Sequence, residues 1–193
     1  MKVKGLEEQR YSYADYLTWD DRERWELIDG VPYAMAAPRR SHQKISMNLS
    51  RVISTFLLGK KCEVYAAPFD VRLEKVSNDD NSAIYTVVQP DISVFCDLSR
   101  LDEKGATGAP DFIIEILSES TVLHDLNRKL ALYEKNDVKE YWVVSPTEQI
   151  IQVHLLKDGK YSHIKQYEKE DKIPVQTLEG LEIALAEIFI EVF

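Results

Sequence analysis

Apolar and polar positions follow two different periods along the chain, and together these periods predict an α/β fold. Apolar residues spaced by threes and fours, as on one face of a helix, occur after Ser41 and in residues 121–136. Short apolar runs typical of buried central strands occur at residues 92–96, 112–117 and 140–144. We therefore expect a mixed central β-sheet flanked by α-helices.

Two Asp-Gly pairs predict β-hairpins added to this core. Asp29-Gly30 lies between alternating apolar residues in residues 24–35, and Asp158-Gly159 separates strands expected at 150–156 and 160–167. Asp-Gly favours tight hairpin turns because such turns require positive φ angles. The remaining elements expected are strands at 63–67 and 69–75, a polar surface loop at 77–82, a C-terminal helix at 185–190, and a short helix at 10–19 with Ser12 as its N-cap.

The composition is that of a folded domain. The 193 residues are 45% apolar and 30% charged, with no repeat or Pro/Gly-rich linker, so we expect a single domain spanning 1–193. No apolar run approaches the roughly 20 residues that cross a bilayer, and the charged first residues do not resemble a signal peptide. We expect a cytoplasmic protein with no membrane contact. Cys62 and Cys96 are too few for a disulfide scaffold, and we expect them to be buried as small apolar residues.

The formal net charge of −9 argues against tight, non-specific nucleic-acid binding, although it does not exclude a local basic stripe. The densest basic stretch includes Arg39, Arg40 and Lys44, which are candidates for phosphate contacts. For any one of them alone, a solvated helix face is the simpler interpretation.

Two acids lie where acids are usually unfavourable. Asp91 follows Pro90 at the start of the strand 92–96, and Glu115 lies inside the apolar strand 112–117. A carboxylate in a central strand costs several kcal/mol of desolvation unless a cation, a proton or several donors compensate it. Two acids from adjacent strands can share one hard cation, most naturally Mg²⁺ or Mn²⁺ in its place, with the Ile116 carbonyl completing the protein ligands.

Each acid also has a simpler interpretation. Asp91 can be a turn residue after proline, and Glu115 can face a solvated side of its strand. Ile113 shares the parity of Glu115, however, so that face of the strand is not plainly polar. The pair is therefore more informative than either residue alone.

Further candidates surround this pair. Glu26 lies in the first hairpin, where a cross-strand ion pair is the simpler interpretation. Lys129 lies on the helix after the Glu115 strand and either pairs with Asp125 on the helix surface or turns inward towards the acids. His42, at the start of the long helix, is a candidate phosphate contact, a general acid or base, or simply a residue of the helix start.

The motifs in this order resemble the PD-(D/E)XK nuclease signature and, more specifically, the Uma-type restriction endonuclease family, formerly a domain of unknown function and abundant in cyanobacteria. The resemblance runs from about Tyr11 to the final helix. The residues that carry it are 25–30, 35–38, His42-Gln43, 89–94, 110–118, Asp125, Lys129, Tyr133 and 138–144.

The resemblance implies a restriction-endonuclease-like core and a Mg²⁺-dependent endonuclease that hydrolyses DNA as a symmetric homodimer, without an organic cofactor. It implies catalytic roles for Asp91, Glu115, Lys129 and Glu26, with Lys129 replacing the signature lysine, because Leu117 occupies that position. The second Pro-Asp pair ends in Asp111, only four residues before Glu115, and is interpreted as the start of the same strand.

Two other functions are compatible with the sequence. One is a nuclease fold that has lost turnover and binds nucleic acid or a partner protein, as the acidic charge and Leu117 favour. The other is a hydrolase that uses Glu26 and Glu115 as paired acid and base, as in glycosidases, which predicts a sugar cleft and no metal dependence.

Overall fold

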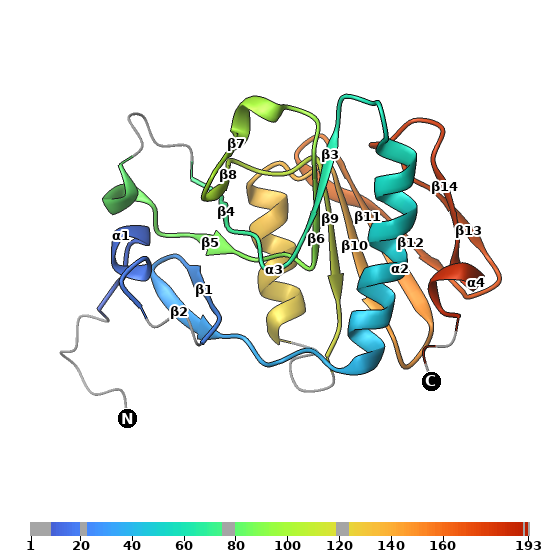
Figure 1. The fold of residues 1–193 in the computed structure, drawn as a ribbon, viewed down its shortest axis with the longest axis horizontal. Coiled ribbons are helices and arrows are strands. Elements are labelled where there is room, and N and C mark those ends of the chain that lie inside the picture. The colour runs from blue at the N-terminus through green and yellow to red at the C-terminus, as the bar shows by residue number, and fades with distance from the viewer. Residues whose placement is uncertain (1–8, 20–22, 75–79, 119–123, 191, 193) are drawn as a thin grey trace.

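The computed structural model describes residues 9–19, 23–74, 80–118, 124–190 and 192. The chain forms a central six-stranded sheet between two long helices, with a second six-stranded sheet on the N-terminal side and a two-stranded sheet near the C-terminus (Figure 1). The expected α/β architecture with added hairpins is confirmed.

The central sheet has the strand order β12-β11-β10-β9-β6-β3. Strand β9 pairs in parallel with β10 and antiparallel with β6, which makes this the predicted mixed sheet. The bounds of its strands are β3 Glu63–Ala66, β6 Ile92–Phe95, β9 Phe112–Ile116, β10 Glu140–Ser145, β11 Ile150–Lys157 and β12 Lys160–Tyr167.

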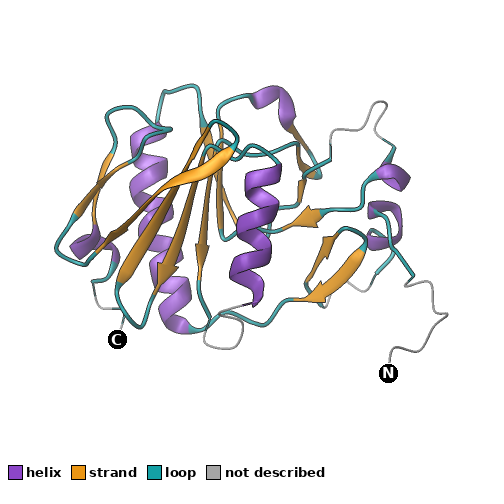
Figure 2. Cartoon of the chain, turned by 180° about the vertical axis from the view of Figure 1, so that it is seen from behind, coloured by secondary structure: helices purple, strands orange, loops and turns teal. Residues whose placement is uncertain are grey.

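Helices α2 (Arg40–Leu57) and α3 (His124–Lys135) cover opposite faces of the central sheet (Figure 2). Ile45 of α2 packs in one core cluster with Ile114 of β9, whereas Tyr133 of α3 packs in a second cluster with Ile113. Alternate residues of a strand point to opposite faces, so β9 contributes to both cores. Both faces are apolar, and Glu115 shares the α3 face with Ile113.

The second sheet has the strand order β2-β1-β5-β4-β8-β7, and the C-terminal sheet pairs β13 with β14. Most of these strands are shorter than the sequence pattern can reveal. Their bounds are β1 Trp25–Ile28, β2 Val31–Ala34, β4 Val71–Arg72, β5 Val87–Val88, β7 Leu101–Asp102, β8 Gly105–Thr107, β13 Lys172–Pro174 and β14 Glu182–Ala184.

Both Asp-Gly hairpins are confirmed. Asp29 and Gly30 adopt φ angles of 49° and 81°, and Asp158 and Gly159 adopt 52° and 74°. These positive angles at both turn residues are those of the tight hairpin turn that Asp-Gly favours. The first hairpin joins β1 to β2, and the second joins β11 to β12.

The short helices are present but shorter than expected. Helix α1 spans Tyr13–Tyr16, with Ser12 as its N-cap in a reciprocal capping box with Asp15. Helix α4 spans Leu185–Ile188. Two 3₁₀ turns, η1 Asn81–Ala83 and η2 Leu98–Arg100, complete the helical segments of the described chain.

Three expected segments differ at their boundaries. The strand expected at 69–75 is reduced to β4, and η1 occupies part of the loop expected at 77–82. Residues 75–79 and 119–123 lie outside the described residues, so the start of the helix expected at 121–136 is described only from His124.

The expectation for the two cysteines is wrong. Cys62 and Cys96 are joined by a disulfide, and both are only partly buried. Cys62 precedes β3 and Cys96 follows β6, and the antiparallel register pairs their neighbours Glu63 and Phe95. The pairing therefore depends on tertiary register, because the 34 intervening residues carry no sequence signal for it.

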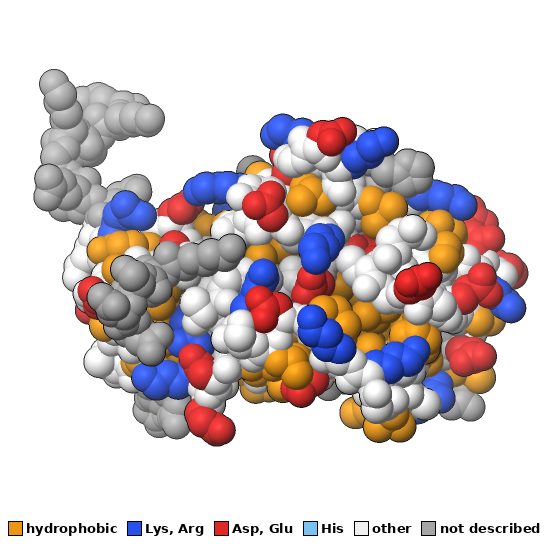
Figure 3. All heavy atoms as spheres, turned by 90° about the horizontal axis from the view of Figure 1, so that it is seen from above, with side chains coloured by type: hydrophobic (Ala, Val, Ile, Leu, Met, Phe, Trp, Pro, Cys, Tyr) orange, Lys and Arg blue, Asp and Glu red, His pale blue; other side chains and the backbone are white. Residues whose placement is uncertain are grey.

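Charge on one face of the molecule is mixed rather than segregated. On the face seen in Figure 3, acidic and basic side chains intermingle. None of the described helices is long and apolar enough to cross a membrane.

Candidate active site

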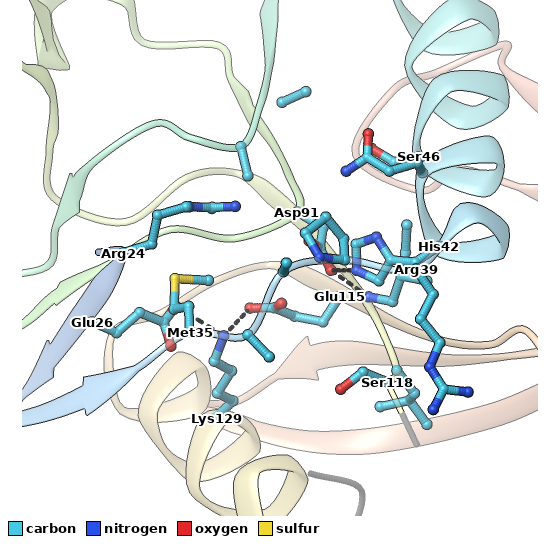
Figure 4. A pocket seen from close by; sticks show the side chains of 18 of the residues that line it. Arg24, Glu26, Met35, Arg39, His42, Ser46, Asp91, Glu115, Ser118 and Lys129 are labelled. Atoms are coloured by element: carbon cyan, nitrogen blue, oxygen red, sulfur yellow. Dashed lines mark hydrogen bonds and ion pairs between the residues drawn. The ribbon is translucent and has the colours of Figure 1, made fainter. Parts of the chain in front are cut away.

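A cavity of about 430 Å³ brings together most of the residues singled out in the sequence. It lies where the first hairpin, the N-terminal part of α2, the C-terminal end of β9 and helix α3 meet. The predicted site residues that line it are Glu26, Arg39, His42, Asp91, Glu115, Ile116 and Lys129 (Figure 4).

Lys129 links two carboxylates inside this cavity. Its ammonium nitrogen lies 2.8 Å from Glu115 Oε1 and 2.9 Å from Glu26 Oε1. All three side chains are largely buried, with exposed fractions of 14%, 11% and 7% respectively. The inward orientation considered for Lys129 is therefore the one adopted, and the ion pair of Glu26 is with a lysine of helix α3 rather than with a cross-strand cation. The side chain of Asp125 lies outside the described residues.

Glu115 is held from α3 by a second donor. The Tyr133 hydroxyl donates to Glu115 Oε1 at 2.6 Å, one helical turn beyond Lys129. Residues four apart lie on the same face of a helix, so α3 presents both donors to one strand residue.

Burial and charge act in opposite directions on this group. Burial raises the pKa of Glu115 above its ordinary value, the Lys129 ammonium opposes that rise, and the charges of Asp91 and Glu26 add to it. Burial lowers the pKa of Lys129, but the two glutamates outweigh it and hold that pKa well above its ordinary value. Lys129 is therefore a retained cation, and Glu115 is a carboxylate poised to gain from a further cation.

Asp91 reaches Glu115 through strand pairing. Strand β6 pairs Ile92 with Ile114, and extending this antiparallel register by one residue sets Asp91 opposite Glu115. Asp91 Oδ2 accepts the Ile116 N–H at 2.8 Å. Pairing of two central strands thus explains why acids distant in sequence occupy one site.

His42 contacts the same aspartate from α2. Its Nε2 lies 3.1 Å from Asp91 Oδ2, and its Nδ1 is buried without a hydrogen-bond partner among the described residues. Burial lowers the pKa of His42. The hydrogen bond to Asp91 and the charges of Asp91 and Glu115 together raise it by more than burial lowers it, so the pKa lies above its ordinary value. His42 is therefore more than a residue of the helix start.

The donor set of Asp91, Glu115 and Ile116 fits a hard divalent cation. Asp91 Oδ2 and Glu115 Oε1 are engaged in hydrogen bonds, which leaves Oδ1 and Oε2 as candidate oxygen ligands. No group of three or more metal-ligating His, Cys, Asp or Glu side chains occurs in the described part of the chain. A pair of carboxylates suits Mg²⁺, which usually keeps several water ligands.

The basic residues of the α2 start divide into two groups. Arg39 lines the cavity, whereas Arg40 donates to the Val192 carbonyl at 3.2 Å and, like Lys44, is absent from the lining among the described residues. Asp111, of the second Pro-Asp pair, accepts the Cys96 N–H and pairs with Lys139 at the start of β9, as expected.

Sequence reasoning missed Arg24, which also lines the cavity. Its Nε and Nη2 donate to Gln89 Oε1 at 3.1 and 2.9 Å. An arginine before a short strand has the sequence pattern of a solvated residue, so only the tertiary fold identifies it.

The paired acid and base of the glycosidase interpretation find little support here. Glu26 and Glu115 both accept from the same ammonium of Lys129, so they form an ion-paired triad rather than a separated acid and base.

Comparisons with known proteins identify the family of the chain. Residues 13–186 match the family Uma2, described as "Putative restriction endonuclease". The chain belongs to the Uma2 family. A protein of Synechocystis sp. (strain ATCC 27184 / PCC 6803 / Kazusa), "Uncharacterized protein slr1290", is 30% identical over 183 residues, which are 93% of this chain and 92% of the relative. A second protein of that organism, "Uncharacterized protein sll1609", is 25% identical over 81% of this chain and 79% of its own length.

A solved structure supports the fold of this Uma2 chain. It is the crystal structure of "a putative nuclease belonging to DUF820" from Anabaena variabilis ATCC 29413, with a TM-score of 0.75 and 18% identity over 94% of this chain and 99% of that one. The family match therefore shows that the chain belongs to Uma2, and the solved structure shows that the two chains share a fold.

Proposed function

We propose that this Uma2 protein is a Mg²⁺-dependent endonuclease that hydrolyses DNA phosphodiester bonds. The observation that carries the proposal is the convergence of Asp91, Glu115 and Lys129 in one largely buried cavity. A lysine beside two acids is the combination that the nuclease signature requires, although here the lysine comes from a helix rather than from the Glu115 strand.

In this proposal Asp91, Glu115 and the Ile116 carbonyl hold the metal. A bound Mg²⁺ ion supplies an acidified water as nucleophile and polarises a phosphate oxygen. Lys129 orients the nucleophilic water and stabilises the negative charge that develops on the phosphate. Glu26 and Tyr133 position Lys129 and Glu115, because each donates or accepts at the atoms that form the ion pair.

His42 has a role at the same aspartate. Its contact occupies Asp91 Oδ2 and leaves Oδ1 as the oxygen that would be available to a metal ion. The Nδ1 side of the ring is then the side that can meet a phosphate oxygen or the leaving group.

The experiment is cleavage of supercoiled plasmid with Mg²⁺, with Mn²⁺ and with EDTA. We expect metal-dependent nicking by the wild type and reduction to background in Asp91→Asn and Glu115→Gln. Asp111→Asn is the matched control, because Asp111 is also a Pro-Asp aspartate but lies at the start of β9 and contacts Cys96 and Lys139. It should retain cleavage.

Metal binding is measured separately by calorimetric titration with Mg²⁺ and Mn²⁺. Metal binding without nicking of any DNA would replace the proposal by the alternative, a nuclease fold that binds nucleic acid without turnover. Nicking that survives both substitutions would overturn the assignment of the site. A symmetric homodimer is part of the proposal, since two-strand cleavage suits two symmetric sites, and light scattering in solution tests it.

A further inference from the structure

Arg24 occupies a distinctive place in the cavity. It precedes β1 and lies on the hairpin side, whereas His42 and Arg39 lie on the α2 side, with Asp91 and Glu115 between them (Figure 4). A strand of ligand crossing the metal-binding acids from one side of the cavity to the other would therefore pass Arg24.

A chain of buried polar contacts fixes the guanidinium of Arg24. Gln89 Oε1 accepts from two nitrogens of the guanidinium, Nε and Nη2. The amide nitrogen of Gln89 in turn donates to Asp70 Oδ1 at 2.8 Å and to the Tyr16 hydroxyl at 3.1 Å. Gln89 is 7% exposed, so this support is internal rather than a surface contact. The guanidinium is thereby oriented before any ligand arrives.

The charge of Arg24 is not neutralised by this support. Its acceptor is a neutral amide, and among the described residues no carboxylate lies within ion-pair distance of it. Lys129 and His42, which also line the cavity, differ, because Lys129 contacts two glutamates and His42 contacts Asp91.

A fixed guanidinium in a cavity is suited to a planar or tetrahedral oxyanion, which it can bind through two donors at once, and the contacts of Arg24 with described residues use only its Nε and Nη2. Next to a metal-binding acid pair, the oxyanion that fits is the phosphodiester of a nucleic-acid strand. We propose that Arg24 is a phosphate-binding residue of the cavity and that Gln89 positions it. This inference rests on the proposed function for the class of ligand, but it concerns binding rather than hydrolysis.

The test is binding of a short fluorescent single-stranded DNA oligonucleotide, followed by anisotropy with Ca²⁺ in place of Mg²⁺. We expect Arg24→Gln to weaken binding about 10- to 100-fold, as for loss of a charge-assisted contact. The slope of log Kd against log salt concentration should decrease by about 1, the amount expected for the loss of one phosphate contact. Arg24→Lys keeps the charge but loses the planar fork, so its affinity should lie between those of Arg24→Gln and the wild type.

Lys157→Gln is the matched control, because it removes one positive charge at an exposed position at the end of β11. Far-UV circular dichroism and the thermal midpoint show whether each variant is folded. If Arg24→Gln were misfolded, the affinity and salt dependence of Arg24→Lys would decide the question.

The outcomes separate this inference from the proposed function. Oligonucleotide binding that depends on Arg24, with no plasmid nicking, would support the phosphate site and overturn the nuclease. Plasmid nicking, together with equal oligonucleotide affinity for Arg24→Gln and Lys157→Gln, would support the nuclease and overturn the phosphate site. Absence of oligonucleotide binding by the wild type would overturn the phosphate site.

Discussion

The ammonium of Lys129 lies 2.8 Å from the carboxylate of Glu115, although the two residues belong to a helix and a strand 14 positions apart. The nuclease signature places its lysine two residues after the acid, where this chain has Leu117. Helix α3 supplies the cation instead, because it packs on the face of β9 that carries Glu115. A cation therefore lies beside the acid, although it comes from a different position in the sequence.

Removing that cation should destabilise the protein as well as abolish cleavage. Lys129→Met keeps much of the side-chain volume but leaves Glu26 and Glu115 buried without their partner, which costs about 3–5 kcal/mol of unfolding free energy. Urea denaturation measures the loss. Lys135→Met, an exposed position on the same helix, should change the stability by less than about 0.5 kcal/mol. Equal effects of the two substitutions would contradict the ion-paired core.

Tyr133→Phe should separate positioning of Glu115 from packing. It removes the hydroxyl donor at 2.6 Å and keeps the ring, which packs edge-on against Tyr141. We expect a loss of about 1.5–3 kcal/mol in stability and a lower rate of plasmid cleavage with little change in oligonucleotide affinity. Tyr161→Phe removes a hydroxyl that donates to the Val138 carbonyl, so it should reduce stability without slowing cleavage. A full cleavage rate in Tyr133→Phe would show that this hydroxyl has no positioning role.

The disulfide should stabilise the fold without contributing to the site. Cys62 and Cys96 close a loop with a sequence separation of 34 residues, and a cross-link of this span is worth about 3–4 kcal/mol. Dithiothreitol, or the double substitution to alanine, should lower the unfolding free energy by this amount while folded protein retains its cleavage rate. Dithiothreitol should not affect the double variant. A stability unchanged by reduction would argue against the cross-link.

His154 should make the fold sensitive to mild acid. Burial lowers the pKa of His154, which stacks on Tyr141 and is 5% exposed. The unfolded chain therefore takes up this proton first as the pH falls, and stability is lost below the unfolded pKa of about 6.5. The difference in unfolding free energy between wild type and His154→Phe should shift in favour of the variant between about pH 6.5 and 5. Parallel pH profiles would show that His154 titrates alike in both states.

The sequence predicted those parts of the molecule that depend on local pattern. Asp-Gly turns, the amphipathic α2 and the apolar strands β6, β9 and β10 are each specified by residues within a few positions of one another. That Asp91 and Glu115 lie close together was also predictable, because a carboxylate in or beside an apolar strand is unfavourable unless a cation or hydrogen-bond donors compensate it.

What the sequence could not predict depends on contacts between distant segments. Strands β4, β5 and β7 have two residues each, too few for a period to be recognised. Arg24 and the Cys62–Cys96 pair have ordinary sequence surroundings, and only the packing of separate strands gives them a role. Lys129 lies between these cases, since the family resemblance suggested its direction and the packing of α3 determines it.

The contact between Glu26 and Lys129 spans 103 residues and joins the N-terminal sheet to the central layer. Neither layer holds the complete ion-paired triad by itself. Under the proposed function, a partly folded chain whose first hairpin is still detached has an incomplete site, so competence for phosphodiester chemistry arrives only when that hairpin packs against α3. On that proposal, the incompletely folded chain would not cut nucleic acid.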